Sequence, residues 1–265
     1  MTVTPLLPRL RLRNVSMVFR QGADAIPAVQ DVSFDVRDGE FVVLVGVSGC
    51  GKSTLLNLIA GLECPSQGTV DMDGVAVHGP SPKRMMMFQE SALFPWLNVL
   101  DNVKFGLRYN PSLSETQRTE KARYYVEMMN LGRFEKACVH QLSGGMKQRV
   151  AQARALAPEP EIILMDEPFA SLDALTRERL YAELQSVFAR TRKTAVFVTH
   201  NVREAACLGD RVLVLSARPG TVKSDVSIPL ARPRDFYDPD VSRLGGHILG
   251  ELRRYGAVHE SDLAT

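Results

Sequence analysis

Hydrophobic and polar residues alternate along two stretches near the N-terminus, residues 10–19 and 29–36. A period of two is typical of strands that bury one face. Phe41–Val45 is continuously apolar, which indicates a strand buried on both faces. Asp73 and Gly74 lie between short alternating runs and predict a hairpin turn. The N-terminal region is therefore expected to be mainly β-structure.

Further along the chain the pattern changes twice. A helix is predicted directly after the buried strand, over residues 52–60. Residues 89–158 are rich in helix-forming residues and contain few β patterns, so they predict an inserted helical subdomain. Strand and helix then alternate again, with apolar strands expected at residues 162–165, 194–199 and 211–215 and an amphipathic helix at about 174–190.

Composition and charge narrow the class of protein. The chain has 265 residues, of which 45% are hydrophobic and 23% charged, and its net charge is +2. These values are typical of a soluble globular protein, and the spread of basic residues does not predict a nucleic-acid surface. The four cysteines are scattered, which favours reduced thiols in a cytosolic protein. The N-terminus does not resemble a secretion signal, and no apolar run approaches the roughly 18 residues that span a bilayer.

A phosphate-binding loop is predicted immediately after the apolar strand. Residues 46–53 fit the pattern GxxxxGK[ST], which needs a strand before it and a helix after it. Glycines allow backbone N–H groups to converge on phosphate oxygens, Lys52 can reach the terminal phosphates, and the Ser53 hydroxyl can bind Mg²⁺. Cys50 fills space in this loop, and its thiol is also a target for alkylation that would block nucleotide. The predicted loop residues are Gly46, Val47, Ser48, Gly49, Cys50, Gly51, Lys52 and Ser53.

Polar residues follow two other predicted strands. Asp166 and Glu167 end the apolar run that begins at Ile162, and His200 follows the strand over residues 194–199. Next to a phosphate-binding loop, Asp166 can hold the Mg²⁺ shell, and Glu167 can orient or deprotonate the attacking water. His200 can contact the γ-phosphate, because open α/β sheets bind ligands at the carboxyl ends of their strands. The alternatives are a charged turn and a structural cap.

Ser143, Gly144 and Gly145 precede another predicted helix, over residues 146–157. Ser143 is a good N-cap, and a cap is the simplest interpretation. Two glycines after a cap weaken a helix, however, which indicates that something approaches the backbone closely. A phosphate would meet this description. Since one ATP needs only one cradle, a second such device predicts a working dimer.

Together these motifs resemble the ATP-binding subunit of an ABC transporter over nearly all of residues 10–220. The loop at 46–53 resembles Walker A, residues 142–145 (Leu-Ser-Gly-Gly) the signature motif, and residues 162–166 with Glu167 the Walker B strand. Residues 171–173 lie at the D-loop position. The resemblance implies an α/β fold: a P-loop NTPase (RecA-like) core, an antiparallel β subdomain, and the helical subdomain at about 89–158. Residues 221–265 are expected to form a peripheral C-terminal tail.

The resemblance also implies further site residues and partners. Phe19 is expected to stack on adenine, Gln89 to sense Mg²⁺ and the membrane partner, and Thr54 to extend the nucleotide-binding set. The cofactors implied are ATP and Mg²⁺, with Ser53, Gln89 and Asp166 as metal ligands. Catalysis is assigned to Glu167, His200, Lys52 and Gln89. A head-to-tail homodimer would hold each ATP between the phosphate loop of one subunit and Ser143, Gly144 and Gly145 of the other.

A finer resemblance is to the importer ATPases of the nitrate, sulfonate and taurine group, carried by residues 89–96, 98–103, 166–177 and 231–234. It departs from that group at Ala170-Ser171, where Gly-Ala is usual. It implies a chain on the cytoplasmic face of the inner membrane that drives uptake of a small anion through a separate permease, with a separate substrate-binding protein. Trp96 either packs in the helical subdomain or lies where the permease docks.

Two other function classes remain to be weighed. Soluble ABC proteins that act on nucleic acid or ribosomes carry tandem cassettes or a long coiled coil, and this chain has one cassette and no sustained heptads. A non-hydrolytic binding module would have no need of Glu167 and His200. The transported substrate is not encoded in these motifs, so nitrate, taurine, alkanesulfonates and pyrimidines resembling thiamine precursors all remain candidates.

Overall fold

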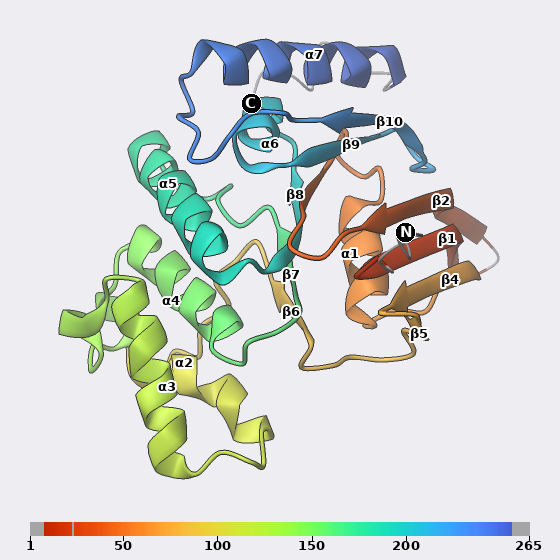
Figure 1. Cartoon of the computed structure of the whole chain (residues 1–265). Helices are drawn as coiled ribbons and strands as arrows, with labels where there is room; N and C mark the ends of the chain where they lie inside the picture. The colour runs from red at the N-terminus through yellow and green to blue at the C-terminus, as the bar shows by residue number, and fades with distance from the viewer. Residues whose placement is uncertain (1–7, 23, 256–265) are drawn as a thin grey trace, which may run out of the picture. The chain divides into compact units, whose positions relative to one another are not determined.

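The computed structural model describes residues 8–22 and 24–255. The chain divides into two compact units, one formed by residues 1–81 with 181–265 and the other by residues 82–180. Figure 1 labels the elements of both. None of the helices in the described part of the chain has the length and apolar character needed to cross a bilayer.

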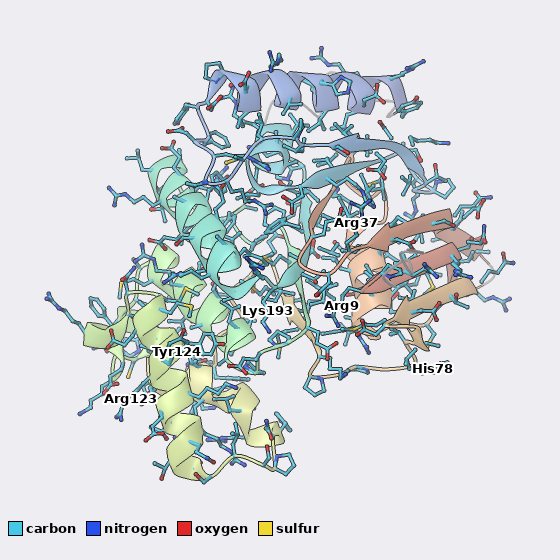
Figure 2. The ribbon with its side chains drawn as sticks, viewed as in Figure 1. Arg9, Arg37, His78, Arg123, Tyr124 and Lys193 are labelled. Carbon is cyan, nitrogen blue, oxygen red and sulfur yellow. The ribbon has the colours of Figure 1, made fainter. Side chains whose placement is uncertain are left out.

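The first unit contains an antiparallel sheet, as the alternating N-terminal residues predict. Its strands are β1 (Leu10–Gln21), β2 (Asp24–Val36), β4 (Gln67–Met72) and β5 (Val75–Ala76), in the order β2-β1-β4-β5. Asp73 and Gly74 form the predicted turn between β4 and β5, both with positive φ. Arg9, labelled in Figure 2, pairs with Asp38 and Asp73 at 2.8 Å and so fastens the start of β1 to two neighbouring turns.

The same unit contains the parallel strands of the core. β3 (Phe41–Val45) pairs in parallel with β8 (Thr194–Thr199) and with β9 (Arg211–Leu215), and these are the bounds that the sequence predicts. Every residue of β3 and β8 is buried, which explains their continuously apolar sequences. Helix α1 (Lys52–Ala60) follows β3, and α6 (Val202–Leu208) joins β8 to β9.

The C-terminal segment continues this unit. Strand β10 (Val222–Ser227) pairs antiparallel with β9, and helix α7 (Pro239–Tyr255) packs on α6 with Val241, Gly245 and Ile248 buried. The sequence did not predict these two elements. The boundary expected at residue 220 falls between two strands that pair in one sheet, and the division of the chain into domain and tail stays a prediction.

The second unit is mostly helical, as residues 89–158 predict. It begins with β6 (Arg84–Met87), which pairs in parallel with β7 (Ile162–Asp166). Between these strands lie α2 (Val99–Phe105), α3 (Glu115–Met128), α4 (Gly144–Leu156) and the 3₁₀ turns Gly106–Tyr109, Gly132–Phe134 and Val139–Gln141. Helix α5 (Ala174–Thr191) starts in this unit and ends in the first.

Polar side chains decide where these helices begin. Asn98 caps α2 by accepting the Asp101 N–H, and Ser114 forms a capping box with Gln117 at the start of α3. Each cap supplies a partner to a backbone N–H that the helix itself leaves without one.

Two reciprocal, buried hydrogen bonds between the Gln185 side chain and the Arg234 backbone hold the segment after β10. The Gln185 amide accepts from the Arg234 N–H at 2.7 Å and donates to the Arg234 carbonyl at 2.9 Å. The Arg234 guanidinium donates to the carbonyls of Ala206 and Gly209, next to α6. Burial lowers the pKa of Arg234 to about 10, so the group stays charged at neutral pH. This segment is therefore fixed by side-chain contacts outside the sheet.

Replacing Gln185 with leucine should destabilise the protein by about 1–3 kcal/mol, because the substitution removes the acceptor of the buried Arg234 N–H and leaves the Arg234 carbonyl with only the weak Cys207 thiol as a donor. Urea unfolding followed by circular dichroism measures this difference. Arg243→Gln is the control, since its pair with Asp240 is exposed and should change the free energy of unfolding by less than about 0.5 kcal/mol. Equal stabilities of the Gln185→Leu variant and the parent would contradict this account.

Candidate functional site

The predicted phosphate loop leaves the carboxyl end of β3 and enters α1. Gly49 and Gly51 have φ angles of 74° and 98°, a region that side chains other than glycine rarely occupy. A Cβ on Gly51 would also lie 2.5 Å from Val29 Cγ1 and 2.8 Å from the Ala28 carbonyl oxygen. Ser48, Gly49 and Ser53 are exposed. The loop therefore presents its backbone at the open end of a helix, where phosphate groups bind.

Lys52 is buried within the loop that it serves. Its side chain is only 6% exposed, and its ammonium group donates to the carbonyl oxygens of Gly46 at 2.8 Å and Val47 at 3.0 Å. Hydrogen bonds to these two carbonyls keep the Lys52 ammonium group inside the loop. Terminal phosphates that enter the loop can replace them with stronger, charge-assisted hydrogen bonds.

The turn between β9 and β10, at Gly220, packs against the phosphate loop and the neighbouring part of β2. The Gly220 N–H donates to the Ala28 carbonyl and the Gly220 carbonyl accepts from Gln30 N–H, both at 2.9 Å. A Cβ on Gly220 would collide with the Cys50 carbonyl oxygen, so only glycine fits. The sequence analysis did not find this support, because its only signal is the Pro219-Gly220 pair, which is common in turns.

Cys50 is completely buried in this packing, which confirms its interpretation as a space-filling residue. Burial raises the pKa of the Cys50 thiol above its usual value, although the nearby Lys52 charge opposes the shift. A thiol that is both buried and protonated reacts slowly, since the thiolate is the nucleophile. Alkylation of Cys50 is therefore less favourable than the sequence alone indicates.

His200 lies at the same edge of the sheet as the phosphate loop. In the parallel pairing of β3 and β8, Val45 lies opposite Thr199, so Gly46 and His200 are the next residues along the two strands. His200 is exposed, and its neighbours fix its backbone. The Thr199 hydroxyl accepts the Asn201 N–H at 3.0 Å and donates to the buried carboxylate of Glu204. The Asn201 side chain in turn caps α6.

Phe19 lies on β1, opposite Ile26 of β2, and is 37% exposed. The same β2 strand contacts the phosphate loop at Ala28 and Val29, two to three residues further along. At about 3.3 Å per residue, the backbone position opposite Phe19 is therefore within about 10 Å of that contact along the strand. An exposed aromatic ring at this distance fits the predicted role of stacking on a base.

The second unit holds the acidic residues. Met87 of β6 lies opposite Met165 of β7, so the continuation of this register pairs position 89 with position 167. Gln89 and Glu167 thus follow neighbouring strand ends. Glu167 has a φ angle of 43°, which is rare for a residue with a side chain. Strained backbone of this kind occurs preferentially at functional positions.

Ser143 caps α4, as predicted, by accepting the Met146 N–H at 3.3 Å, and the helix begins two residues earlier than expected. Ser143 and Gly144 are exposed. A Cβ on Gly145 would lie 2.7 Å from the Thr176 methyl group, and one on Gly144 would lie 3.2 Å from Leu172. Packing against the start of α5 therefore explains at least one of the two glycines without any phosphate.

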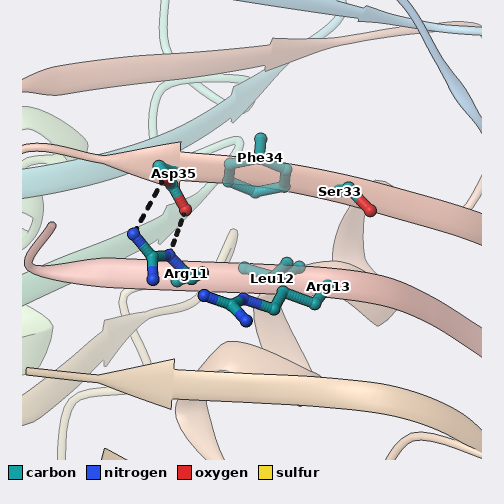
Figure 3. A pocket seen from close by; sticks show the side chains of 6 residues that line it. All are labelled: Arg11, Leu12, Arg13, Ser33, Phe34 and Asp35. Carbon is teal, nitrogen blue, oxygen red and sulfur yellow. Dashed lines mark hydrogen bonds and ion pairs between the residues drawn. The ribbon is translucent and has the colours of Figure 1, made fainter. Parts of the chain in front are cut away.

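The structure thus assembles the predicted residues in two sets. The first unit contains Phe19, the phosphate loop through Thr54, and His200, and the second contains Gln89, Asp166, Glu167 and the sequence Ser143-Gly144-Gly145. A separate hollow of about 420 Å³ lies on the antiparallel sheet, between β1 and β2. Figure 3 shows that the Arg11 guanidinium in this hollow is paired with Asp35.

Comparisons with known proteins identify the family of this chain. The family model described as ABC transporter matches residues 29–170. The chain belongs to the ABC transporter family. It is 48% identical, over 86% of its length and 85% of the relative's, to an uncharacterised ABC transporter ATP-binding protein of Methanocaldococcus jannaschii. Subunits of this family hydrolyse ATP to drive transport.

Two further relatives have more specific names. The chain is 42% identical to the taurine import ATP-binding protein TauB of Jannaschia sp., over 84% of this chain and 83% of TauB. It is 44% identical to the nitrate import ATP-binding protein NrtD of Synechocystis sp., over 83% of both chains. The dimeric ATP-binding cassette MJ0796, solved with ADP and Pi, superimposes with a TM-score of 0.72 at 33% identity, over 84% of this chain and all of that one. The α/β P-loop NTPase fold is confirmed.

Lys52→Ala should weaken ATP binding at least about tenfold, because the triphosphate loses its central cationic partner. Titration with a fluorescent ATP analogue measures the dissociation constant. Lys223→Ala is the control, since Lys223 is an exposed lysine on β10 of the same unit. An unchanged dissociation constant for Lys52→Ala would show that the loop does not bind the triphosphate in this way.

Proposed function

We propose that this chain is the ATP-hydrolysing subunit of an importer, which energises the uptake of a small anion such as taurine, nitrate or an alkanesulfonate through a separate membrane permease. The observation that carries the proposal is the similarity to TauB and NrtD along more than four fifths of each chain. The phosphate loop and His200 at one sheet edge supply a site that suits the reaction.

The nucleotide would be held first by the unit that contains the phosphate loop. Adenine stacks on Phe19, the N–H groups of residues 49–54 surround the phosphates, and Lys52 exchanges its two carbonyl partners for phosphate oxygens. His200 contacts the γ-phosphate from the neighbouring strand end. These contacts fix the γ-phosphorus in place but do not by themselves activate water.

Hydrolysis requires the carboxylates of the second unit. Water attacks the γ-phosphorus, the bond to the β–γ bridging oxygen breaks, and Glu167 accepts or orients the proton of the attacking water. Ser53, Gln89 and Asp166 offer hydroxyl, amide and carboxylate oxygens, the hard ligands that Mg²⁺ prefers. When bound, Mg²⁺ would neutralise charge on the β- and γ-phosphates.

The active form is proposed to be a head-to-tail homodimer. MJ0796, which has the same fold, forms a dimer that was solved with ADP and Pi. In such a dimer, Ser143, Gly144 and Gly145 of the partner subunit would bind the γ-phosphate. Ser143 and Gly144 are exposed on the isolated chain, and the helix begins with N–H groups that have no intrahelical acceptor.

The permease is proposed to dock on the exposed side chain of Trp96, in the segment after Gln89. Trp96 is the only tryptophan of the chain and is 75% exposed, so its interpretation as a core residue is wrong for this structure. Its ring lies 5.6 Å from that of Phe94. Tryptophan is strongly enriched among residues that dominate binding at protein interfaces. The chain would thus lie on the cytoplasmic face of the inner membrane, while a substrate-binding protein and the permease select the cargo.

The alternative, a soluble ABC ATPase that acts on nucleic acid or ribosomes, is not favoured, because TauB and NrtD are import proteins. A substrate-binding protein and an absence of nucleic-acid partners remain part of the proposal. Stimulation of ATP hydrolysis by nucleic acid rather than by the permease would reverse this choice.

Glu167→Gln should bind ATP with an affinity close to that of the parent but hydrolyse it at least about 100-fold more slowly, since general-base catalysis contributes 10²–10⁴-fold. Because the bound ATP persists, the variant should accumulate as a dimer, which size-exclusion chromatography with light scattering detects. Wild-type turnover in this variant would remove the assigned role of Glu167.

Ser143→Arg is the companion variant for the dimer. Arginine at the exposed cap should abolish the ATP-dependent dimer of Glu167→Gln but leave ATP binding by the monomer unchanged. Loss of monomer binding as well would show that Ser143 does not act from a partner subunit.

Trp96→Ala should weaken binding to the cognate permease by about tenfold or more, because it removes a large exposed aromatic surface. Co-purification of the two proteins from detergent and biolayer interferometry measure the effect. Tyr124→Ala is the control: Tyr124, labelled in Figure 2, is 61% exposed on α3 of the same unit. Equal effects of the two substitutions would place the docking surface elsewhere.

A further inference from the structure

The segment that carries Trp96 is fastened to the signature helix α4 by one arginine. Arg154, near the end of α4, donates to the Ala92 carbonyl at 2.8 Å and to the Ser91 carbonyl at 3.0 Å. Its guanidinium also lies 5.4 Å from the centre of the Phe94 ring. Arg154 thus contacts three residues of this short segment, Ser91, Ala92 and Phe94.

A second residue of α4 holds the same segment. The Ser91 hydroxyl donates to the Gln148 side-chain oxygen at 3.1 Å, and Gln148 is buried. Gln148 and Arg154 lie six residues apart on one helix. The backbone at residues 91–92 is therefore held to α4 by hydrogen bonds from two turns of the helix.

The segment is held in a strained conformation. Ala92 has a φ angle of 43°, in the left-handed region, which is unfavourable for a residue with a side chain. Such backbone persists only where the surroundings fix it, and it is concentrated at ligand clamps and switch regions. Arg154 binds the carbonyl of this same residue, so the interaction that fixes the strained peptide comes from α4.

The opposite end of α4 carries the proposed γ-phosphate contact. Ser143 caps the helix, and Arg154 follows eleven residues later, which corresponds to about 16 Å along the axis. An α-helix of this length moves as a rigid element. The Phe94 ring lies next to both the Trp96 ring and the Arg154 guanidinium, so these three side chains form one continuous contact.

We propose that Arg154 is the positioning residue that links the Trp96 segment to the signature helix, so that a partner docked at Trp96 biases the placement of Ser143. The inference rests on the proposed docking of the permease, and it adds the route by which docking changes nucleotide binding. Arg154 touches neither nucleotide nor partner in this scheme. It acts through the carbonyls of Ser91 and Ala92.

Coupling between two sites is reciprocal, which gives a test without the permease. If docking at Trp96 biases Ser143, then ATP bound against Ser143 of the partner subunit must change the affinity of the Trp96 segment for its partner by the same factor. We expect this change to show, in the protein alone, as a shift of the Trp96 segment when ATP binds. Trp96 is the only tryptophan, so fluorescence excited selectively at tryptophan, rather than at the tyrosines, reports on this segment alone.

The experiment measures acrylamide quenching of Trp96 in the full-length Glu167→Gln protein, with and without saturating ATP and Mg²⁺. We expect ATP to change the quenching constant, and Arg154→Gln in the same background to reduce this change at least about fivefold. Arg154→Lys, which keeps the charge but cannot serve two carbonyls in fixed geometry, should give an intermediate change. An undiminished response in Arg154→Gln, or no response in the parent, would overturn the proposal.

The matched control is Arg118→Gln. Arg118 also donates to a loop carbonyl of this unit, that of Asn110 at 3.1 Å, but it belongs to α3. It should leave the response of Trp96 to ATP unchanged, and equal losses in the two variants would indicate a general loosening of the unit. If Arg154→Gln does not fold, as judged by circular dichroism, then Arg154→Lys decides: a response equal to the parent's contradicts the proposal.

Measuring permease binding distinguishes failure of the proposed link through Arg154 from failure of the proposed docking site at Trp96. A Trp96 response that depends on Arg154, together with permease binding unaffected by Trp96→Ala, would refute the docking site and leave the link to Ser143 intact. Weaker permease binding by Trp96→Ala, together with an ATP response that does not depend on Arg154, would support docking and refute the link.

Discussion

The parallel register between β3 and β8 is the constraint on which the nucleotide site of the first unit depends. Val45 opposite Thr199 sets Gly46 and His200 at the same edge. A shift of one residue would turn each side chain of a strand to the opposite face, and both strands are buried throughout, so the register is strongly specified. Core packing thus determines which polar residues lie together at the proposed nucleotide site.

The phosphate loop needs support as well as position. Its glycines give freedom to the backbone, and such freedom has to be removed if the N–H groups are to converge on phosphate. Ala28 and Val29 of β2 close one side of Gly51, and Gly220 closes the side of Cys50. The antiparallel sheet and the turn after β9 therefore hold the loop in place, which gives these peripheral segments a role in nucleotide binding.

Much of this could be predicted from the sequence, for reasons that differ between residues. The bounds of β3, α1, β8 and β9 followed from unbroken apolar runs and a glycine loop, which are local signals. Helix α7 and strand β10 were missed because they are stabilised by tertiary contacts, α7 with α6 and β10 with β9, which leave no local pattern in the sequence. The hydrogen bond between Arg234 and Gln185 was missed for the same reason, since it joins residues 49 positions apart. The exposure of Trp96 was equally invisible, since an aromatic residue among helix formers fits a core and a surface alike.

Residues whose backbone conformation departs from the preference of their residue type are the most informative about the functional site. Glu167 and Ala92 both adopt positive φ without being glycine, and no propensity scale predicts them there. Gly145 illustrates the opposite error: two glycines at a helix start suggested a phosphate, yet the Thr176 methyl group alone requires one of them. The proposed second phosphate contact is therefore supported by the exposed cap of Ser143 and by the backbone N–H groups at the start of α4 that have no intrahelical acceptor, rather than by the presence of two glycines. Near the other end of α4, Arg154 donates to the carbonyl of Ala92, the residue with the strained backbone. The exposed cap of Ser143 and the contact with the strained peptide therefore lie at opposite ends of the same helix.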